Sequence, residues 1–285
     1  MSDLIQAVGQ YQIRDLLMGP GTGFIIRRPG STPHPWPDMS SDDVPFDQGH
    51  GIHAGSDLLG GRRVPLTIGI RAASRSAARA ALQTLQAAWR PTSTDIELAW
   101  RDDLGTFRFV GRPRLADPNE DLVSAGVVDV ECRFMATNPF YEAAIPGSDT
   151  TSRTTAGSGF TPPFTPAFTL GASTDGTLRA TNVGSADASW TARLEGPLTN
   201  PVITNLATRE RLAFSANGGL VLGAGEFVAI DAAARSVLLA GTASRRSQLS
   251  LDSRWWSLAP GDTDIELTAD AGTGTLSVTW RSAWI

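Results

Sequence analysis

The sequence predicts a mainly β protein with two domains and a single helix in its N-terminal half. The chain has 285 residues, which is more than one compact core usually holds. It contains 29 glycines and 18 prolines, as expected where many short strands are joined by turns. Apolar residues recur with period two through much of the chain, and helical spacing is convincing in one stretch only.

The first 57 residues are expected to form strand and loop. Phe24-Ile25-Ile26 is a short apolar run of the strand type, and it follows the glycine-rich stretch 19–23. Residues 29–57 are polar and contain five prolines, which predicts a long loop. Long loops in compact domains usually serve an interface or stay mobile, so we expect this loop to contact adjacent proteins.

A half-buried strand and the helix are predicted next. Residues 63–70 alternate between apolar and other positions, and Pro65 indicates an edge or a strand start. Residues 74–90 then change to helical spacing, with Ser74 as the predicted N-cap and Pro91 ending the helix. The apolar positions of the strand and the helix are Val64, Leu66, Ile68 and Ile70, and Ala78, Leu82, Leu85 and Trp89.

Alternation returns over residues 94–134. Ile96, Leu98 and Trp100 form one strand face, Phe107 and Phe109 a second, and Val128, Val130, Cys132 and Phe134 a third. Cys132 therefore lies on an apolar face, and we interpret it as a core residue and not as a nucleophile. As the single cysteine, it has no internal disulfide partner, which fits assembly in a reducing compartment.

A composition change divides the chain. The sequence predicts an N-terminal domain over 1–142, a Gly/Ser/Thr/Pro-rich linker or loop over 143–164, and a C-terminal domain over 165–285. The last range holds short strand-like segments about ten residues apart, which predict a β-sandwich without helices. Examples of these segments are 190–194, 219–222, 226–230 and 236–239.

Charge argues against nucleic-acid binding. The formal net charge is -5, and residues 1–140 contribute -2 of it, so neither half has a basic field. All 24 basic residues are arginines. No apolar run approaches the roughly 20 residues that span a bilayer, and the first residues show no signal peptide.

The sequence does not predict an enzyme, a metal site or a cofactor. Residues 19–23 lack the lysine of a phosphate-binding loop. His50 and His53 lie near two aspartates in a glycine-rich loop that does not fix ligand geometry. A serine hydrolase would need a Gly-x-Ser-x-Gly elbow, which does not accompany the histidines. The alternating acidic residues Asp262, Asp264 and Glu266 lack calcium-loop spacing, so we interpret them as a solvated strand face.

One part of the C-terminal half resembles a known family. The segments 196–205, 220–231 and 253–265 are similar to the C-terminal domain of siphophage distal tail proteins (the Dit, or phage tail family, group of minor tail proteins). The residues that carry this likeness are Gly196, Asn200, Pro201, Asp231, Trp256, Pro260 and Gly261. Asp262 stands where asparagine is common, and both residues tolerate a turn.

Local chemistry adds expectations about these motifs. Proline after Asn200 predicts an extended backbone there. Pro260-Gly261 is expected to form a turn after an apolar Trp-x-Leu strand. Adjacent Trp255 and Trp256 are expected to face opposite sides of that strand, one toward the core and one outward. Interface candidates are Trp255, Trp256 and Trp89.

The resemblance implies a hexameric ring, or hub, that connects the tail tube of a long-tailed bacteriophage to its tip or baseplate. It implies a ring-forming N-terminal domain comparable to tail-tube subunits and a galectin-like C-terminal sandwich. The expected partners are further copies of the chain, the tail tube protein and the tail-associated hub protein. DNA would pass through the lumen without specific binding. The expected location is the virion tail tip, assembled in the host cytoplasm, without membrane insertion.

Two other functions stay open at this point. A carbohydrate-binding module of the tail tip would stack a host glycan on Trp190, Trp255, Trp256, Trp280 or Trp284. A cell-wall hydrolase would need a cleft with paired carboxylates, and the sequence indicates none.

Overall fold

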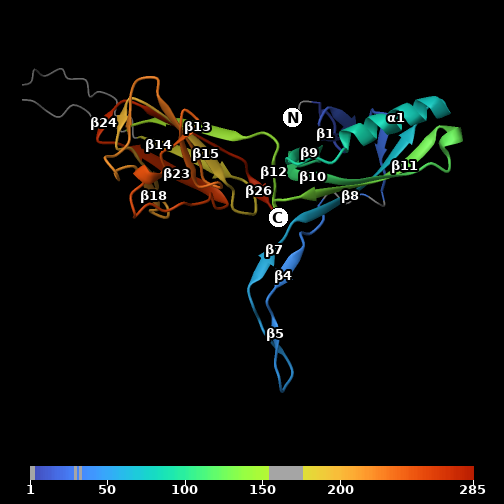
Figure 1. Cartoon of the computed structure of the whole chain (residues 1–285), viewed down its shortest axis with the longest axis horizontal. Helices are drawn as coiled ribbons and strands as arrows, with labels where there is room; N and C mark the ends of the chain where they lie inside the picture. Colours follow the sequence, from blue (N-terminus) through green and yellow to red (C-terminus); the bar gives the residue numbers. More distant parts are fainter. Residues whose placement is uncertain (1–3, 29–30, 32–33, 154–175) are drawn as a thin grey trace, which may run out of the picture. The chain divides into compact units, whose positions relative to one another are not determined.

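A computed structural model describes residues 4–28, 31, 34–153 and 176–285 of the chain. Contacts divide the chain into two compact units, Met1–Ile145 with Ile285 and Pro146–Trp284. Strands dominate both units, and α1 (Arg75–Ala88) is the one α-helix among the described residues (Figure 1). The predicted mainly β fold with a single helix is therefore confirmed.

The N-terminal unit is built on one antiparallel sheet that is nearly closed into a barrel. Its strands are β1 (Tyr11–Ile13), β2 (Leu16–Met18), β3 (Phe24–Ile26), β8 (Arg62–Arg71), β9 (Ile96–Arg101), β10 (Thr106–Asn119), β11 (Val127–Ala136) and β12 (Tyr141–Ala143). They run in the order β2-β1-β9-β10-β11-β8-β3, and β12 pairs with β10. Gly19 N donates to Phe24 O at 2.6 Å and links the two end strands, so little strand edge stays unpaired.

Strand β8 confirms the alternation predicted over residues 63–70, and it pairs with β11 along its whole length. Thr67 N donates a hydrogen bond to Ser31 Oγ at 2.9 Å, on the side away from β11. Alternation places the backbone of Pro65 on that same open side, where a missing N–H removes no ladder bond. The predicted apolar face, Val64, Leu66, Ile68 and Ile70, is buried.

Helix α1 also follows the predicted pattern. Its N-cap is Ser74, whose Oγ accepts a hydrogen bond from Ala77 N at 3.2 Å. It ends two residues earlier than predicted, and Arg14 donates to Ala87 O and Arg90 O at 3.0 Å each. These bonds satisfy carbonyls that a helix end leaves unpaired. The predicted apolar face, Ala78, Leu82, Leu85 and Trp89, is buried.

Residues 34–61, here called the arm, form two short ladders where a loop was predicted. They are β4 (Met39–Ser41) with β7 (Asp57–Leu59), and β5 (Val44–Pro45) with β6 (Ile52–His53). The arm leaves the sheet at the start of β8 and extends away from it (Figure 1). The loop predicted over 29–57 is wrong where these four strands lie, because strands of two or three residues with exposed faces leave no alternating pattern.

The C-terminal unit contains three sheets. Their strands are β13 (Gly147–Ser152), β14 (Thr177–Asn182), β15 (Trp190–Glu195), β16 (Leu198–Thr199), β17 (Val202–Asn205), β18 (Arg211–Ala213), β19 (Val221–Leu222), β20 (Phe227–Asp231), β21 (Ser236–Leu239), β22 (Ala243–Ser244), β23 (Gly261–Thr268), β24 (Ala271–Gly272) and β25 (Thr275–Trp280). The last strand, β26 (Ala283–Trp284), lies outside these three sheets. The orders are β13-β25-β15-β20-β21-β22, β14-β23-β17-β18 and β19-β16-β24. The long strands bury every second residue, as the strands of a sandwich do.

Part of the predicted linker is a strand. Residues 147–152 form β13, which pairs with β25 over six residues, so the prediction of a linker or loop over 143–164 is wrong there. Arg153 then donates to the carbonyl oxygens of Ala269 and Gly272 at 2.9 Å each. Serine and threonine occur both in strands and in linkers, so composition alone does not distinguish the two. Residues 154–175 lie outside the described part of the chain.

Candidate interaction surfaces

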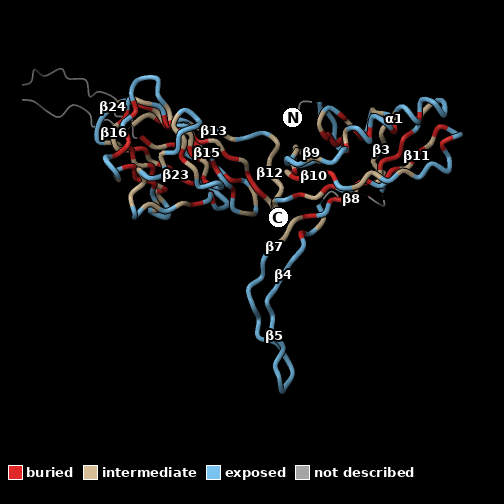
Figure 2. Tube along the Cα trace, in the orientation of Figure 1, coloured by how far each residue is buried: buried red, intermediate tan, exposed pale blue. Residues whose placement is uncertain are grey.

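The arm exposes large apolar side chains on both of its faces. Trp36 is 68% exposed, Leu58 65% and Met39 63%, and Figure 2 shows the arm exposed along most of its length. At the tip, the ring of Phe46 packs edge-on against His53 with 4.5 Å between ring centroids. Two-stranded ribbons of this kind are marginally stable in water on their own, and exposed apolar patches mark interaction sites. The remaining exposed apolar side chains of the arm are Val44, Phe46 and Ile52.

The arm is also uniformly acidic. Residues 34–61 contain five aspartates and neither arginine nor lysine. Asp38 pairs with Arg63 at 3.2 Å at the base of the arm, and Asp43 Oδ1 accepts a hydrogen bond from Gly55 N at 2.8 Å. Within the described chain, Asp42, Asp47 and Asp57 form no ion pair. The arm therefore combines apolar surface with free negative charge.

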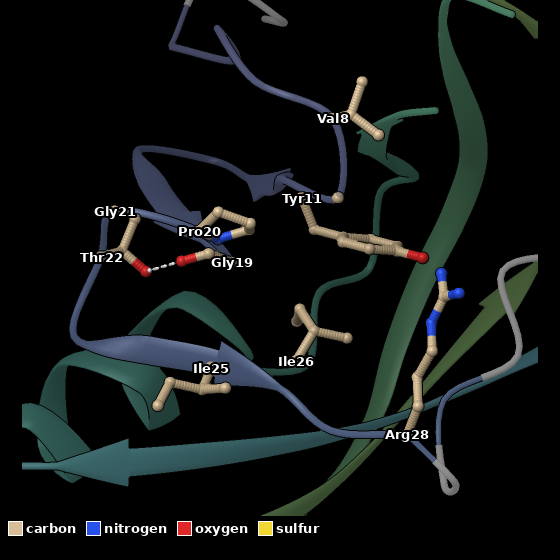
Figure 3. Close-up of a pocket in the computed structure, with 10 residues that line it drawn as sticks. Val8, Tyr11, Gly19, Pro20, Gly21, Thr22, Ile25, Ile26 and Arg28 are labelled. Carbon is tan, nitrogen blue, oxygen red and sulfur yellow. Dashed lines mark hydrogen bonds between the residues drawn. The ribbon is translucent and has the colours of Figure 1, made fainter. Parts of the chain in front are cut away.

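A pocket of about 560 Å³ lies where the two end strands of the barrel meet (Figure 3). Its walls are mainly apolar, and one cation, Arg28, points toward the hydroxyl of Tyr11 (Figure 3). Burial raises the pKa of the Tyr11 phenol, and the nearby guanidinium opposes that rise. Other lining side chains are Val8, Pro20, Ile25 and Ile26.

The glycine-rich stretch 19–23 beside this pocket is a tight turn with two hydrogen bonds inside it. Thr22 Oγ1 donates to Gly19 O at 2.8 Å, and Thr22 N donates to the same oxygen at 3.1 Å. Gly19 has a φ of 109°, and a Cβ there would lie 2.5 Å from Gly9 O, so only glycine fits. The turn shapes the barrel seam and has no lysine to hold a phosphate.

A second groove, of about 500 Å³, lies at the end of α1 and carries two arginines. It is formed by residues 86–91, without 88, and by residues 114–116 of β10. A β-bulge between Pro113 and Leu115 interrupts the ladder here, and Arg114 is the extra, exposed residue. Arg90 is exposed as well, and neither guanidinium forms an ion pair within the described residues. We call this surface the arginine groove.

The groove lining contains no carboxylate. Arg114 acts electrostatically on Asp95, which Arg112 Nε holds at 2.6 Å and Thr137 Oγ1 at 2.7 Å. These hydrogen bonds lower the pKa of Asp95 below its ordinary value, so its charge is already committed to them. The arginine groove therefore presents two arginines that form no ion pair within the described residues, beside an apolar floor.

Two of the three predicted interface residues are core residues. Trp89 is buried, and its indole Nε1 donates to Arg133 O at 3.1 Å. Trp256 is buried against Trp190, with 4.9 Å between ring centroids. Neither ring is available to a partner, so these two predictions are wrong; Trp255 is half-buried and stays a candidate. As expected, one ring of the adjacent pair lies in the core and the other does not.

The same burial weakens the carbohydrate alternative. Trp190, Trp256 and Trp280 are buried, and their rings are not free to stack on a sugar. Trp190 and Trp280 also donate their indole N–H groups to backbone oxygens, at 3.0 and 2.8 Å. Only Trp255 and Trp284, both half-buried, remain of the five proposed stacking residues.

The family-like residues occupy turns and strand ends of the C-terminal unit. Asn200 has a φ of 47°, so the predicted extended backbone is wrong, and asparagine is among the few residues that tolerate this left-handed conformation. Asp231 ends β20, and its Oδ1 accepts from Ala234 N at 2.9 Å. Gly261, with a φ of 103°, begins β23 after Pro260. The expected Trp-x-Leu strand is an irregular segment with one bridge, from Leu258 to Ala188.

A Cβ on Gly196 would lie 2.3 Å from Gly223 O, which excludes any other residue at this position. Pro201 is buried, and its carbonyl oxygen accepts from Phe214 N at 3.1 Å. These positions therefore determine the path of the chain and offer no chemistry of their own.

The histidines and acidic residues do not gather into a metal site. His50 and His53 are exposed on the arm, and His34 Nε2 lies 3.4 Å from Asp102 Oδ2. Among the described residues, no cluster of three or more His, Cys, Asp or Glu side chains has a geometry for a metal ion. Asp264 pairs with Arg179 at 2.7 Å on the predicted solvated face of β23. None of the helices in the described residues has the length and apolarity to cross a membrane.

Comparison with protein families matches residues 183–284 to the siphovirus-type tail component, C-terminal domain. This match covers most of the C-terminal unit and confirms the resemblance to distal tail proteins predicted from the sequence. A comparison with curated proteins gives no match.

Solved structures extend the likeness to the N-terminal unit. The chain is similar to Dit of phage SPP1, a paradigm of the hub adsorption apparatus in phages that infect Gram-positive bacteria; the TM-score is 0.62 at 14% identity, over 90% of this chain and 93% of that one. It is also similar to a chain of the phage P2 baseplate in its activated conformation with calcium, with a TM-score of 0.53 at 8% identity, over 95% and 97%. At these identities the likeness shows the fold.

Proposed function

We propose that this chain, a siphovirus-type tail component that resembles distal tail proteins, assembles into a hexameric ring between the tail tube and the tip or baseplate. In this proposal the N-terminal domain, residues 1–142, closes the ring, and the C-terminal sandwich, residues 165–285, projects outward. DNA passes through the lumen without specific binding. The tail tube protein and the tail-associated hub protein are the neighbours, and the ring is assembled in the host cytoplasm before it becomes part of the virion.

The arm is the observation that carries this proposal. It holds six exposed large apolar side chains on a ribbon that has no core of its own. Such a ribbon is stabilised when a partner covers it, because isolated two-stranded hairpins are marginal in water. A subunit of a stacked, ring-shaped assembly needs this kind of reaching contact, whereas a free-standing sugar-binding module does not.

The net charge of the N-terminal domain supports a lumen through which DNA can slide. Residues 1–140 carry a net charge of -2 in a chain whose net charge is -5. A strongly basic channel would neutralise phosphates, release counterions and hold the DNA in place. A mildly acidic N-terminal domain leaves a passing duplex free to slide.

The test is the mass of the full chain in solution, measured by light scattering over a concentration series, with negative-stain images of the same samples. Six-fold rings with an open centre are the expected result. Closed assemblies of another symmetry would overturn the hexamer, and a chain that is monomeric both alone and with tail tube protein added would overturn the ring.

A further inference from the structure

We propose that the acidic arm of one copy seats in the arginine groove of the next copy, so that ion pairs between Asp42 and Asp47 on one side and Arg90 and Arg114 on the other give the ring its direction. This inference rests on the proposed ring and names the two surfaces that meet in it. It concerns two surfaces of the same chain with opposite charge.

Opposite charge is the reason for choosing the arm of a second copy as the occupant of the arginine groove. The arm presents five carboxylates and neither arginine nor lysine, and Asp42, Asp47 and Asp57 form no ion pair in the described chain. The groove presents Arg90 and Arg114 without a lining carboxylate. Opposite charges of this kind guide association and fix the register of an interface. Arginine suits such a contact, because its planar group forms paired hydrogen bonds with a carboxylate.

The two surfaces also match in their apolar parts. The groove floor includes Pro91, Leu115 and Ala116. The arm offers Val44, Phe46 and Ile52 within a few residues of the free aspartates. Aromatic and aliphatic anchors surrounded by charge are the usual composition of a protein interface. The seam pocket is a weaker receptor, because its lining holds one cation, Arg28, which already lies beside Tyr11.

The contact must join different copies. The arm ends directly before β8, at residue 61, and extends away from the sheet (Figure 1). No arm carboxylate is paired with Arg90 or Arg114 in the described chain. An arm and a groove at different places on one subunit make a head-to-tail contact, and repeated head-to-tail contacts produce a ring when the rotation closes.

The groove also has a chemical alternative, because exposed arginines bind phosphate. We favour the arm for two reasons. Every copy of the chain carries one arm for each groove, and the chain's net charge of -5 repels a polyanion such as DNA. DNA binding at the groove is therefore one outcome that the test must separate.

Cross-linking between copies tests the inference. Gln48→Cys places a thiol at the arm tip and Gln86→Cys places one on the groove rim, with all arginines and aspartates intact. The two variants, with tags of different size, are mixed and treated with a short bis-maleimide. We expect a heterodimer. Leu251→Cys, at a fully exposed position of the C-terminal unit, is the matched control and should give none with Gln48→Cys.

Reversing the charges of the groove arginines and the arm aspartates tests whether ion pairs hold the two surfaces together. Arg90→Glu with Arg114→Glu in the groove copy should lower the heterodimer yield by roughly tenfold, and Asp42→Arg with Asp47→Arg in the arm copy should restore it. Equal yields in all combinations would overturn the inference. A groove variant that loses a DNA gel shift while giving no cross-link would assign the groove to DNA and overturn it too.

The outcomes also separate this inference from the proposed function. Open six-fold rings that form without the Gln48–Gln86 cross-link overturn the arm-to-groove contact and leave the ring in place. A chain that gives neither rings nor cross-links overturns the contact, and the place of the protein in the tail is then decided by imaging virions that carry a tagged copy.

Discussion

Asn200 turns the chain between β16 and β17, and its backbone and side chain are both involved. Its φ is 47°, its N–H donates to Leu220 O at 2.8 Å, and its Nδ2 donates to Asp270 Oδ2 at 2.8 Å. Left-handed backbone costs most side chains about 1 kcal/mol or more. Asparagine tolerates it, which explains this residue type immediately before Pro201.

We expect Asn200→Ala to lower the free energy of unfolding by about 2 kcal/mol, since it adds left-handed strain and removes a hydrogen bond. Asn200→Gly removes the hydrogen bond alone and should cost about half as much. Chemical unfolding of both variants measures the difference. Equal losses would mean that the backbone conformation contributes nothing.

Cys132 carries a thiol that burial makes unreactive. It is buried on β11, and desolvation raises the pKa of its thiol to about 12. The interpretation as a core residue is confirmed. We expect a thiol reagent to modify it only as fast as the N-terminal unit opens, with labelling that accelerates in denaturant. Rapid labelling of the native chain at neutral pH would contradict this.

At the scale of elements, Arg108 of β10 joins three strands. It forms ion pairs with Glu97 of β9 and with Glu142 of β12, the latter at 2.7 Å, and its side chain is 17% exposed. Arg108→Met would remove the cation that pairs with both of these half-buried carboxylates. We expect a loss of about 2 kcal/mol in the free energy of unfolding.

A double variant, Arg108→Met with Glu142→Gln, supplies the control for Arg108. It removes one of the two opposed charges, so part of the stability should return. If the double variant is as unstable as the single one, repulsion between the carboxylates is not the cause.

The arm is an element whose removal should separate folding from assembly. Replacement of residues 39–58 by a short Gly-Ser turn deletes exposed residues and no buried one. We expect the unfolding midpoint to stay within error of the full chain, while light scattering shows the loss of rings. A large drop in stability would mean that the arm belongs to the fold of the N-terminal unit.

Periodic elements could be predicted from the sequence and short ones could not. The spacing of Leu82 and Leu85 and the alternation around Ile68 each report one buried face, and a buried face is the strongest signal that a sequence carries. The arm has no buried face, and β13 is built of serine and threonine, so both escaped prediction. The arginine groove escaped because a bulge brings Arg114 beside a helix end far along the chain.

At the scale of the whole molecule, ion pairs and hydrogen bonds link stability to pH. Bonds from Arg112 and Thr137 lower the pKa of Asp95, and Arg179 does the same for Asp264. A carboxylate whose native pKa is depressed adds stability above its ordinary value of 3.8, and that stability is lost as pH falls through the native value. Asp252, held by Ser250 and Arg211, behaves alike.

We therefore expect unfolding midpoints in urea to be nearly constant from pH 7 to 5 and to fall below about pH 4. Asp95→Asn should reduce the size of this fall and lower the midpoint at pH 7. A variant whose acid-side fall equals that of the unmodified chain would show that the Asp95 hydrogen bonds do not contribute to it.

The attachment of the arm to β8 has a mechanical consequence. Tension on the arm enters the barrel at Arg62, the first residue of a ten-residue strand that pairs with β11 throughout. Force applied along a strand loads its ladder in shear, so the hydrogen bonds resist together and do not unzip one after another. A partner that holds the arm, as proposed above, would therefore pull on all ten residue pairs of this ladder together.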